Sequence, residues 1–311
     1  MTARRYVGRF APSPTGRLHL GNLRSALLGW LDARAAGGAF LLRIEDLDPD
    51  RSKPEHVAGL FEDLQFLGLD WDGEVLHQSR RAEAYREALE QLRLAGRVYP
   101  CTCSRAEVAR AASAPHVGED GPLYPGTCRA GATPKAGRTA SLRFKVAPGV
   151  VRFHDALHGP FVQDVEHAVG DFVVQRTDGV ASYQLAVVVD DAATGVTHVL
   201  RGDDLLSSTP RQLQLIDALG LEAPAYAHVP LLLQPDGKRL AKREGALTAA
   251  ALRARGVSAE ALVGLLAKWS GLGDGTPCRA AELLPGFSLS KVRREPTVVH
   301  DEELDALVQT T

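Results

Sequence analysis

The sequence predicts an α/β protein in which a parallel sheet is interrupted by a smaller, cysteine-bearing segment. The stretches RRYVGRF and AFLLRIED are typical of strands, and a helical pattern lies between them. A second alternation of apolar strands and helices begins near residue 167, and three of the four cysteines lie between these two parts. Strand–helix–strand units build parallel sheets with helices on their faces, which defines the fold class.

Residues 1–96 are expected to form the first half of a catalytic domain. RRYVGRF predicts a strand and APSPTGRLH a loop. From Leu20 to Leu31 the apolar residues recur at helical spacing, and a pair of glycines then ends the helix. The next strand, AFLLRIED, is apolar enough to be buried on both faces. Two further helices are expected near residues 54–67 and 80–95.

Residues 97–166 are interpreted as an insertion into that domain. VYPCTCSRAEV combines two cysteines with a capping box formed by Ser104 and Glu107. The stretches ASLRFKV and VVRFHDALHGPFVQDV predict strands of a separate small sheet. A cysteine cluster in a chain with no export signal favours a metal site over disulfides, and buried cysteines without a metal are the alternative.

Residues 167–245 return to the α/β pattern, and residues 246–311 are expected to be a short, mostly helical region. SYQLAVVVDD is either a buried strand or a helix, and GVTHVLRG and HVPLLL predict strands. A helix is expected from Pro210 to Leu219. QPDGKRLAKREGA is a polar loop that contains glycine.

Composition and charge narrow the classes of function. The chain has 311 residues and a net charge of −2, so any contact with nucleic acid must use a local basic face. GKRLAKREG and SKVRREP could supply such a face, or could be two solvated loops. The N-terminus lacks the apolar core of a secretory signal, and no apolar run is long enough to cross a membrane. We therefore expect a cytoplasmic monomer.

The loop APSPTGRLHLGN indicates a nucleotide site. A loop from a buried strand into a helix lies at the carboxyl end of a parallel sheet, where α/β proteins bind ligands. The N–H groups of a helix start suit phosphate. Gly16 and Gly21 let the backbone approach a ligand, and His19 can donate a hydrogen bond or carry charge beside phosphate. A simple turn with a helix cap would give the same pattern.

The run GKRLAKREG places several cations on a loop flanked by glycine. Such a loop could fold over a triphosphate, because phosphoryl and nucleotidyl transfer depend mainly on positioned positive charge. Alone, such a run is more often a solvated surface.

Five blocks in order resemble the class I aminoacyl-tRNA synthetases. PSPTGRLHLGN and RLAKR resemble the HIGH and KMSKS motifs of that class, and RIEDLD, SYQLAVVVDD and VLRGDDLLSSTPRQ resemble its glutamyl branch. The resemblance covers about residues 5–250. It implies a ligase that uses ATP with Mg²⁺. The implied fold is a Rossmann-type catalytic domain with an inserted zinc-containing, acceptor-type subdomain and a short helical C-terminal region.

The resemblance also implies a glutamate site. Arg201 would hold the side-chain carboxylate of L-glutamate through a bidentate pair, and Arg9 would contribute to this contact. Tyr183 would offer a hydroxyl group to the substrate. Ser13 and Glu45 would position the amino acid, with Glu45 on its ammonium side.

An ATP site is implied in the same way. His19, Asn22 and Lys242 match the two signature motifs and would stabilise the phosphates while the amino-acid carboxylate attacks the α-phosphate. The implied ATP-binding residues are Pro12, Gly16, His19, Gly21, Asn22, Arg239 and Lys242.

Three positions depart from the family pattern. Arg239 replaces the first lysine of KMSKS and keeps its charge, whereas Ala241 replaces the serine and loses a hydroxyl group. Val187 stands where full-length glutamyl enzymes usually have asparagine. This last change is expected to remove a polar contact to substrate or acceptor.

The cysteines fit a single structural zinc ion. Cys101, Cys103 and Cys128 supply three thiolates, and zinc takes four ligands in a tetrahedron. His116 would be the conventional fourth ligand. The resembled family instead has tyrosine in a YxGxC motif, present here as YPGTC, and we therefore favour Tyr124.

The region after the KMSKS-like block is short. Residues 246–311 are too few for the anticodon-binding region of a glutamyl-tRNA synthetase, and the resemblance is therefore to a short paralogue. This paralogue activates glutamate without tRNA and transfers it to the queuosine base in the anticodon loop of tRNA(Asp). The alternatives are a truncated enzyme that charges a tRNA 3′ end and a non-catalytic tRNA-binding protein.

Overall fold

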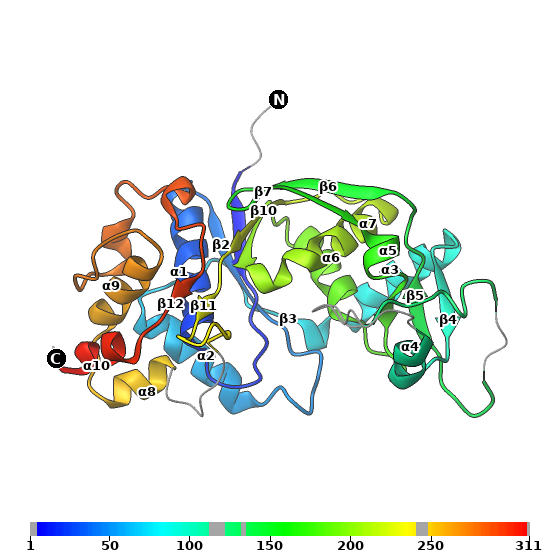
Figure 1. The fold of residues 1–311 in the computed structure, drawn as a ribbon, viewed down its shortest axis with the longest axis horizontal. Coiled ribbons are helices and arrows are strands. Elements are labelled where there is room, and N and C mark those ends of the chain that lie inside the picture. Colours follow the sequence, from blue (N-terminus) through cyan, green and yellow to red (C-terminus); the bar gives the residue numbers. More distant parts are fainter. Residues whose placement is uncertain (1–4, 112–121, 132–134, 241–247, 310–311) are drawn as a thin grey trace.

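The computed structural model describes residues 5–111, 122–131, 135–240 and 248–309. The molecule is elongated, with both of its ends formed by small helical or mixed units (Figure 1). The first part of the chain forms β1 (Val7–Phe10), α1 (Leu20–Ala35), β2 (Ala39–Ile44), α2 (Pro54–Phe66), β3 (Leu76–His77), η1 (Gln78–Arg80) and α3 (Ala82–Leu94).

Three further groups of elements follow. The middle segment forms β4 (Val98–Cys101), α4 (Arg105–Ala111), β5 (Ser141–Phe144), β6 (Val150–Asp155), β7 (Gly159–Asp164) and α5 (Val165–Ala168). The next forms β8 (Phe172–Gln175), α6 (Tyr183–Ala193), β9 (His198–Gly202), η2 (Asp203–Ser208), α7 (Thr209–Ala218), β10 (Ala225–Val229) and β11 (Leu232–Leu233). The last forms α8 (Ala249–Ala254), α9 (Ala259–Trp269), η3 (Ala280–Leu283), η4 (Leu289–Lys291), β12 (Thr297–Val298) and α10 (Asp301–Gln309).

Two parallel sheets meet edge to edge at the centre of the molecule. One has the order β1-β2-β3, and the other has β7-β6-β10-β9, in which only β7 is antiparallel to its neighbour. The N–H of Thr197 donates to the carbonyl of Val7 at 2.9 Å, which places β1 beside the start of β9. The predicted α/β class with a parallel sheet is confirmed.

The small antiparallel sheet differs from the prediction. It has the order β4-β5-β8, and the β6–β7 hairpin that was expected to join it pairs instead with β10. Asp155 of β6 lies opposite Tyr226 of β10, and the Phe153 and Tyr226 rings pack edge to face with centroids 5.8 Å apart. The hairpin therefore extends the central sheet.

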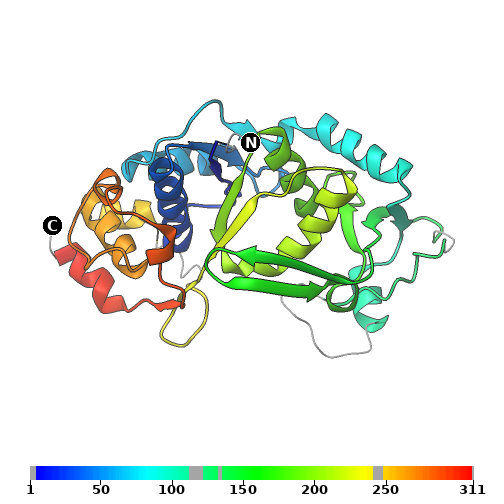
Figure 2. The same ribbon diagram turned by 90° about the horizontal axis from the view of Figure 1, so that it is seen from above.

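Helix α1 is the central packing element. Ten of its sixteen residues are buried, because it lies between the sheet and the C-terminal helices (Figures 1 and 2). Leu27 and Leu31 share one apolar cluster with Leu262, Leu266 and Trp269 of α9. A helix that is apolar nearly all round is stable only when it is covered on both sides. The helical region after residue 248 is thus part of the main core.

Local sequence signals correspond to the ends of several elements. SYQLAVVVDD, which was ambiguous, forms helix α6. The expected capping box is present: Ser104 N donates to the Glu107 carboxylate at 2.7 Å, and Glu107 N donates to Ser104 Oγ at 3.2 Å. Within the described ranges, no helix is both long enough and apolar enough to cross a membrane.

Candidate active site

A cavity of about 630 Å³ opens at the carboxyl ends of β1, β2, β9 and β10, beside the start of α1. This is where parallel α/β sheets bind ligands. Its wall includes eleven of the residues predicted for the glutamate and ATP sites: Arg9, Pro12, Ser13, Gly16, His19, Gly21, Asn22, Glu45, Tyr183, Arg201 and Arg239. Lys242 and Ala241 lie outside the described residues.

His19 is the N-cap of α1. Its Nδ1 accepts the N–H of Asn22 at 3.4 Å, which places the proton of a neutral ring on Nε2. Its backbone forms an antiparallel bridge with Thr248, which follows the KMSKS-like loop. The two signature segments, more than 200 residues apart in the chain, therefore meet at the cavity.

Gly21 gives the His19 ring its space. A Cβ atom added at Gly21 would lie 3.1 Å from both Cε1 and Nδ1 of His19, closer than ordinary van der Waals contact. The sequence interpretation was that this glycine makes room for ATP. The structure shows that the first group to occupy the direction of its missing Cβ is the imidazole ring of His19.

Substitution of Gly21 with alanine is expected to lower kcat for the adenylate formation that the family resemblance implies by about 10-fold. The reason is that the imidazole ring must move, whereas catalytic contacts require sub-ångström placement. Stability should not fall, since alanine favours a helix over glycine by about 1 kcal/mol. Pyrophosphate exchange and thermal unfolding measure the two effects. Gly273→Ala is the control, because a Cβ there would meet nothing within 4 Å. Unchanged kcat in the Gly21 variant would contradict this account.

Arg201 projects from the end of β9 and is 6% exposed. Its Nε donates to His228 Nε2 at 3.0 Å and its Nη1 to Tyr183 Oη at 3.3 Å. Its Nη2 donates to Thr209 Oγ1 at 2.8 Å and to the carbonyl of Leu205 at 3.3 Å. All four acceptors are neutral groups or can be neutral. Among the described residues, no carboxylate pairs with this guanidinium.

Arg9 is held in a different way. Asp191 Oδ1 accepts from Arg9 Nε at 3.3 Å and from Arg43 Nη1 at 2.5 Å, and Arg43 Nη2 donates to Glu45 Oε1 at 3.1 Å. The four groups carry two positive and two negative charges in their ionised forms. The charge of Arg9 is therefore compensated inside the protein, whereas the charge of Arg201 is available to a ligand.

The pKa values of the two carboxyl groups move in opposite directions. Burial raises the pKa of Glu45 above its usual value, although Arg43 and Arg9 oppose this rise. Burial also acts to raise the pKa of Asp191, but Arg43 and Arg9 outweigh it and lower that pKa. Asp191 is thus the firmly ionised centre of this cluster.

Sequence reasoning missed several residues that shape the cavity. Arg43, Asp191, His228 and Thr209 were not proposed, although each contacts a residue of the cavity wall. The available signal was a polar residue within an apolar strand or helix, such as Asp191, the second aspartate after LAVVV. Only the fold shows which of these residues face one another.

Val187 lies one turn after Tyr183 on α6 and is 1% exposed. It packs in an apolar cluster with Leu185, Val188 and Leu215. It does not belong to the cavity wall. The expected loss of a polar substrate contact therefore concerns a residue that sits in the core here.

The basic loop begins as a hairpin between β11 and Arg239. Arg239 pairs with Leu233 in an antiparallel bridge, and its Nη1 lies 3.3 Å from the Asp204 carboxylate. Pro12 is fixed from the other side, because its carbonyl accepts the N–H of Glu45 at 3.0 Å. These contacts hold the ends of both signature segments against the sheet.

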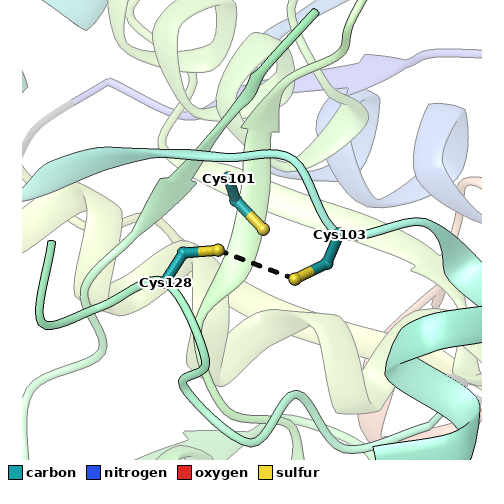
Figure 3. Close-up of side chains that lie close together, drawn as sticks. All are labelled: Cys101, Cys103 and Cys128. Carbon is teal, nitrogen blue, oxygen red and sulfur yellow. Dashed lines mark hydrogen bonds between the residues drawn. The ribbon is translucent and has the colours of Figure 1, made fainter. Parts of the chain in front are cut away.

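A second candidate site lies at the far end of the molecule, where Cys101, Cys103 and Cys128 point their sulfur atoms toward one another (Figure 3). The three Sγ atoms lie within 4.8 Å of one another, and those of Cys103 and Cys128 are 3.6 Å apart. Sulfur atoms around tetrahedral zinc, each about 2.3 Å from the metal, are separated by about 3.8 Å. The thiols are free and their spacing fits a metal rather than a disulfide.

Tyr124 is next to this cluster, whereas His116 lies outside the described residues. Tyr124 Oη is 3.4 Å from Cys101 Sγ and accepts the N–H of Cys128 at 2.9 Å. Arg143 Nε donates to Cys101 Sγ at 3.3 Å, and its guanidinium lies over the Tyr124 ring. A tyrosine oxygen and one cation thus accompany the three sulfur atoms.

The thiols differ in acidity. Burial opposes ionisation of Cys101, but hydrogen bonds from Tyr124, the N–H of Cys103 and Arg143 lower its pKa to about 7. Burial and the neighbouring sulfur atoms raise the pKa of Cys103 to about 11. Ionisation of Cys101 to the thiolate, the ligand form of cysteine, is thus easier than for an ordinary cysteine even without a metal.

The family model of the class I tRNA synthetases (E and Q), catalytic domain, matches residues 6–306. The chain belongs to this family. The match spans both signature segments and the cavity between them.

Named relatives in this synthetase family are similar over nearly their whole length. The glutamyl-Q tRNA(Asp) synthetase of Symbiobacterium thermophilum is 54% identical, over 96% of this chain and 98% of the relative. The enzyme of the same name from Nitratidesulfovibrio vulgaris is 47% identical, over 98% of both chains.

A solved synthetase structure agrees with the fold. The crystal structure of a glutamate tRNA ligase from Elizabethkingia meningosepticum in complex with its amino acid superposes with a TM-score of 0.84 at 27% identity. The superposition covers 98% of this chain and 69% of that one. The class I synthetase catalytic fold expected from the sequence is confirmed.

Proposed function

We propose that this protein is a glutamyl-Q tRNA(Asp) synthetase. It forms glutamyl-adenylate from L-glutamate and ATP without tRNA, and then transfers glutamate to the queuosine base at the wobble position of tRNA(Asp). Relatives 54% and 47% identical over nearly full length carry this name. The structural observation that carries the proposal is Arg201, a buried cation at the wall of the cavity that no carboxylate of the described residues pairs with.

In this proposal the inner part of the cavity binds glutamate. Arg201 pairs with the side-chain carboxylate, and Tyr183 donates its hydroxyl beside it. Glu45 faces the ammonium group, Arg9 contributes a contact from the end of β1, and Ser13 contacts the amino acid from the signature loop. An unpaired buried arginine selects a second carboxylate and disfavours the neutral amide of glutamine.

The outer part of the cavity binds ATP with Mg²⁺. His19 donates from Nε2 to a phosphate oxygen, and the side-chain amide of Asn22 adds N–H donors. The cations of the basic loop neutralise the charge of the transition state. The proposed ATP-binding residues are Pro12, Gly16, His19, Gly21, Asn22, Arg239 and Lys242.

The reaction has two steps. In the first, an oxygen of the glutamate α-carboxylate attacks the α-phosphorus of ATP, and pyrophosphate leaves with the electrons of the broken P–O bond. In the second, the queuosine base takes the glutamyl group from the adenylate and AMP leaves. In the first step the protein supplies placement and positive charge, since reactions at phosphorus depend mainly on these. The second step is acyl transfer, to which the protein contributes placement of the two reactants.

We further propose that the part of residues 97–166 that precedes the β6–β7 hairpin belongs to an acceptor-type subdomain with one structural zinc ion. Cys101, Cys103, Cys128 and Tyr124 are its proposed ligands. The sulfur spacing supports this set, as does Tyr124 Oη beside Cys101 Sγ. A closed set of four protein ligands is typical of structural zinc.

Substitution of Cys101 with serine is expected to remove zinc from the purified protein, from about one ion per chain to less than about 0.2, because a hard hydroxyl is a poor zinc ligand. Metal analysis after dialysis measures this. Cys278→Ser is the matched control, because Cys278 is not part of the cluster. Full zinc content in the Cys101 variant would contradict the ligand assignment.

Glutamate-dependent exchange of labelled pyrophosphate into ATP, without tRNA, tests the first step. We expect exchange with glutamate, and much less with glutamine or aspartate supplied in parallel. A protein that shows no exchange with any of the three amino acids would be a binding protein rather than a synthetase.

Transfer of labelled glutamate to tRNA tests the second step. The acceptors are tRNA(Asp) with queuosine, tRNA(Asp) with unmodified guanosine at the wobble position, and tRNA(Glu). We expect label only on the queuosine-containing tRNA. Label on tRNA(Glu) alone would identify an enzyme that charges a 3′ end.

A further inference from the structure

A completely buried acid–imidazole pair lies behind Arg201. Asp155 ends β6 and His228 belongs to β10, and both residues are 0% exposed. Asp155 Oδ2 lies 2.6 Å from His228 Nδ1, and His228 Nε2 lies 3.0 Å from Arg201 Nε. The three side chains form a continuous series across β6, β10 and β9 that ends at the cavity.

The geometry fixes which atoms carry protons. A guanidinium N–H only donates, so His228 Nε2 is an acceptor and the ring proton is on Nδ1, where it donates to Asp155 Oδ2. The other oxygen, Asp155 Oδ1, accepts three backbone N–H groups: Leu157 at 3.0 Å, His158 at 3.0 Å and His228 at 3.2 Å. Every atom of the Asp155 carboxylate therefore has a defined partner.

We propose that Asp155 and His228 are positioning residues that hold Arg201 through a neutral imidazole, so that its guanidinium is fixed in place while its charge remains available to the side-chain carboxylate of the substrate. This inference rests on the proposed glutamate site and adds the pair that sets its geometry.

Arg9 shows the alternative arrangement, in which a carboxylate contacts the guanidinium directly. Arg9 contacts Asp191 directly, and a carboxylate at hydrogen-bond distance cancels most of the potential of a guanidinium. A carboxylate directly on Arg201 would compete with the substrate in the same way. With the His228 ring between them, Asp155 orients the arginine without occupying its binding face.

The protonation states agree with this geometry. Burial lowers the pKa of His228 to about 4, with Arg201 acting in the same direction and Asp155 opposing it, so the ring is neutral near pH 7. Burial acts to raise the pKa of Asp155, but the hydrogen bonds from His228 and the backbone outweigh it and lower that pKa. The Tyr226 ring, stacked with His228 and 5.6 Å from the Arg201 guanidinium, adds an apolar wall.

Asp155→Asn tests the role with an isosteric change. Three backbone N–H groups keep the amide oxygen at the Oδ1 position, so the amide NH₂ must face His228 Nδ1. The ring proton then moves to Nε2, where it opposes Arg201. We expect the KM for glutamate in pyrophosphate exchange to rise by about 10- to 100-fold, with the KM for ATP within about twofold. Asp164→Asn is the control, since Asp164 also ends a hairpin strand and pairs with a histidine, His167, but within the described residues neither side chain of that pair hydrogen-bonds to the cavity wall.

Two outcomes of this assay overturn different claims. Wild-type protein that exchanges pyrophosphate with glutamate, together with an unchanged glutamate KM in Asp155→Asn, would overturn the positioning role alone. Wild-type protein without glutamate-dependent exchange would overturn the proposed function and the role that rests on it.

A measurement on the wild-type protein does not depend on activity or on the folding of a variant. Nitrogen-15 NMR of the histidine rings should show His228 as the Nδ1–H tautomer. Because the pKa of His228 is lowered to about 4, its ring should remain neutral between pH 5.5 and 8. An Nε2–H tautomer, or titration near the ordinary histidine value, would overturn the inference. His228→Gln, which retains an acceptor for Arg201, should raise the glutamate KM less than His228→Leu.

Discussion

Substitution of Arg201 with alanine is expected to raise the KM for glutamate by at least about 100-fold. Removal of one partner of a buried charge pair costs about 2–5 kcal/mol, or roughly 30- to 5000-fold in affinity. The upper part of this range applies because Arg201 is 6% exposed, and because Arg9, the other arginine of the proposed glutamate site, already pairs with Asp191. The discrimination between glutamate and glutamine should also fall when Arg201 is removed.

Steady-state pyrophosphate exchange at varied glutamate and ATP measures this effect. The KM for ATP should change little, and Arg201→Lys should be intermediate, since it keeps the charge but loses the planar fork. Arg34→Ala is the control for loss of an ion-paired arginine from the same fold, because Arg34 pairs with Asp70 and Asp72 away from the cavity. Kinetics of Arg201→Ala equal to the wild type would rule out the assigned role.

Substitution of Asp191 with alanine is expected to lower the free energy of unfolding by about 3–5 kcal/mol. The reason is that two buried guanidinium groups, those of Arg9 and Arg43, would lose their shared carboxylate and only Glu45 would remain to compensate them. The displaced guanidinium groups should also disturb Glu45, so that the KM for glutamate rises in any folded fraction.

Chemical unfolding at pH 7, monitored by far-ultraviolet circular dichroism, measures the loss. Asp305→Ala is the control because Asp305 also pairs with an arginine, Arg255, but both side chains are about half exposed. That exposed pair should cost about 0–1 kcal/mol. Equal losses of unfolding free energy in the two variants would show that the buried cluster stabilises the protein no more than the exposed pair does.

The sequence predicted those parts of the fold whose signals are local. The strand–helix–strand unit, the helix starting at Leu20 and the capping box at Ser104 all depend on spacing within about ten residues. The apolar run in SYQLAVVVDD was ambiguous because it is equally compatible with a buried strand and a buried helix. Its helical state depends on packing against distant elements.

Long-range pairing was the part that the sequence did not specify. The β6–β7 hairpin was assigned to the small sheet because its neighbours in the chain belong there, yet its partner β10 begins 70 residues after β6 ends (225 − 155). The same limit applies to the buried polar residues behind the cavity wall. Asp155, Asp191 and His228 gain their roles only from the crossing of separate elements, whereas the motif residues could be named from the sequence.

The contact between Val7 and Thr197 has a consequence for how the protein folds during synthesis. These residues are 190 positions apart, and their hydrogen bonds join the two halves of the central sheet. Until residue 197 has left the ribosome, the outer edge of β1 has no native partner, and the wall that Arg201 provides does not exist. At about 5–20 residues per second, the nascent chain carries its first signature loop for roughly 10–40 seconds before the proposed glutamate pocket can form beside it.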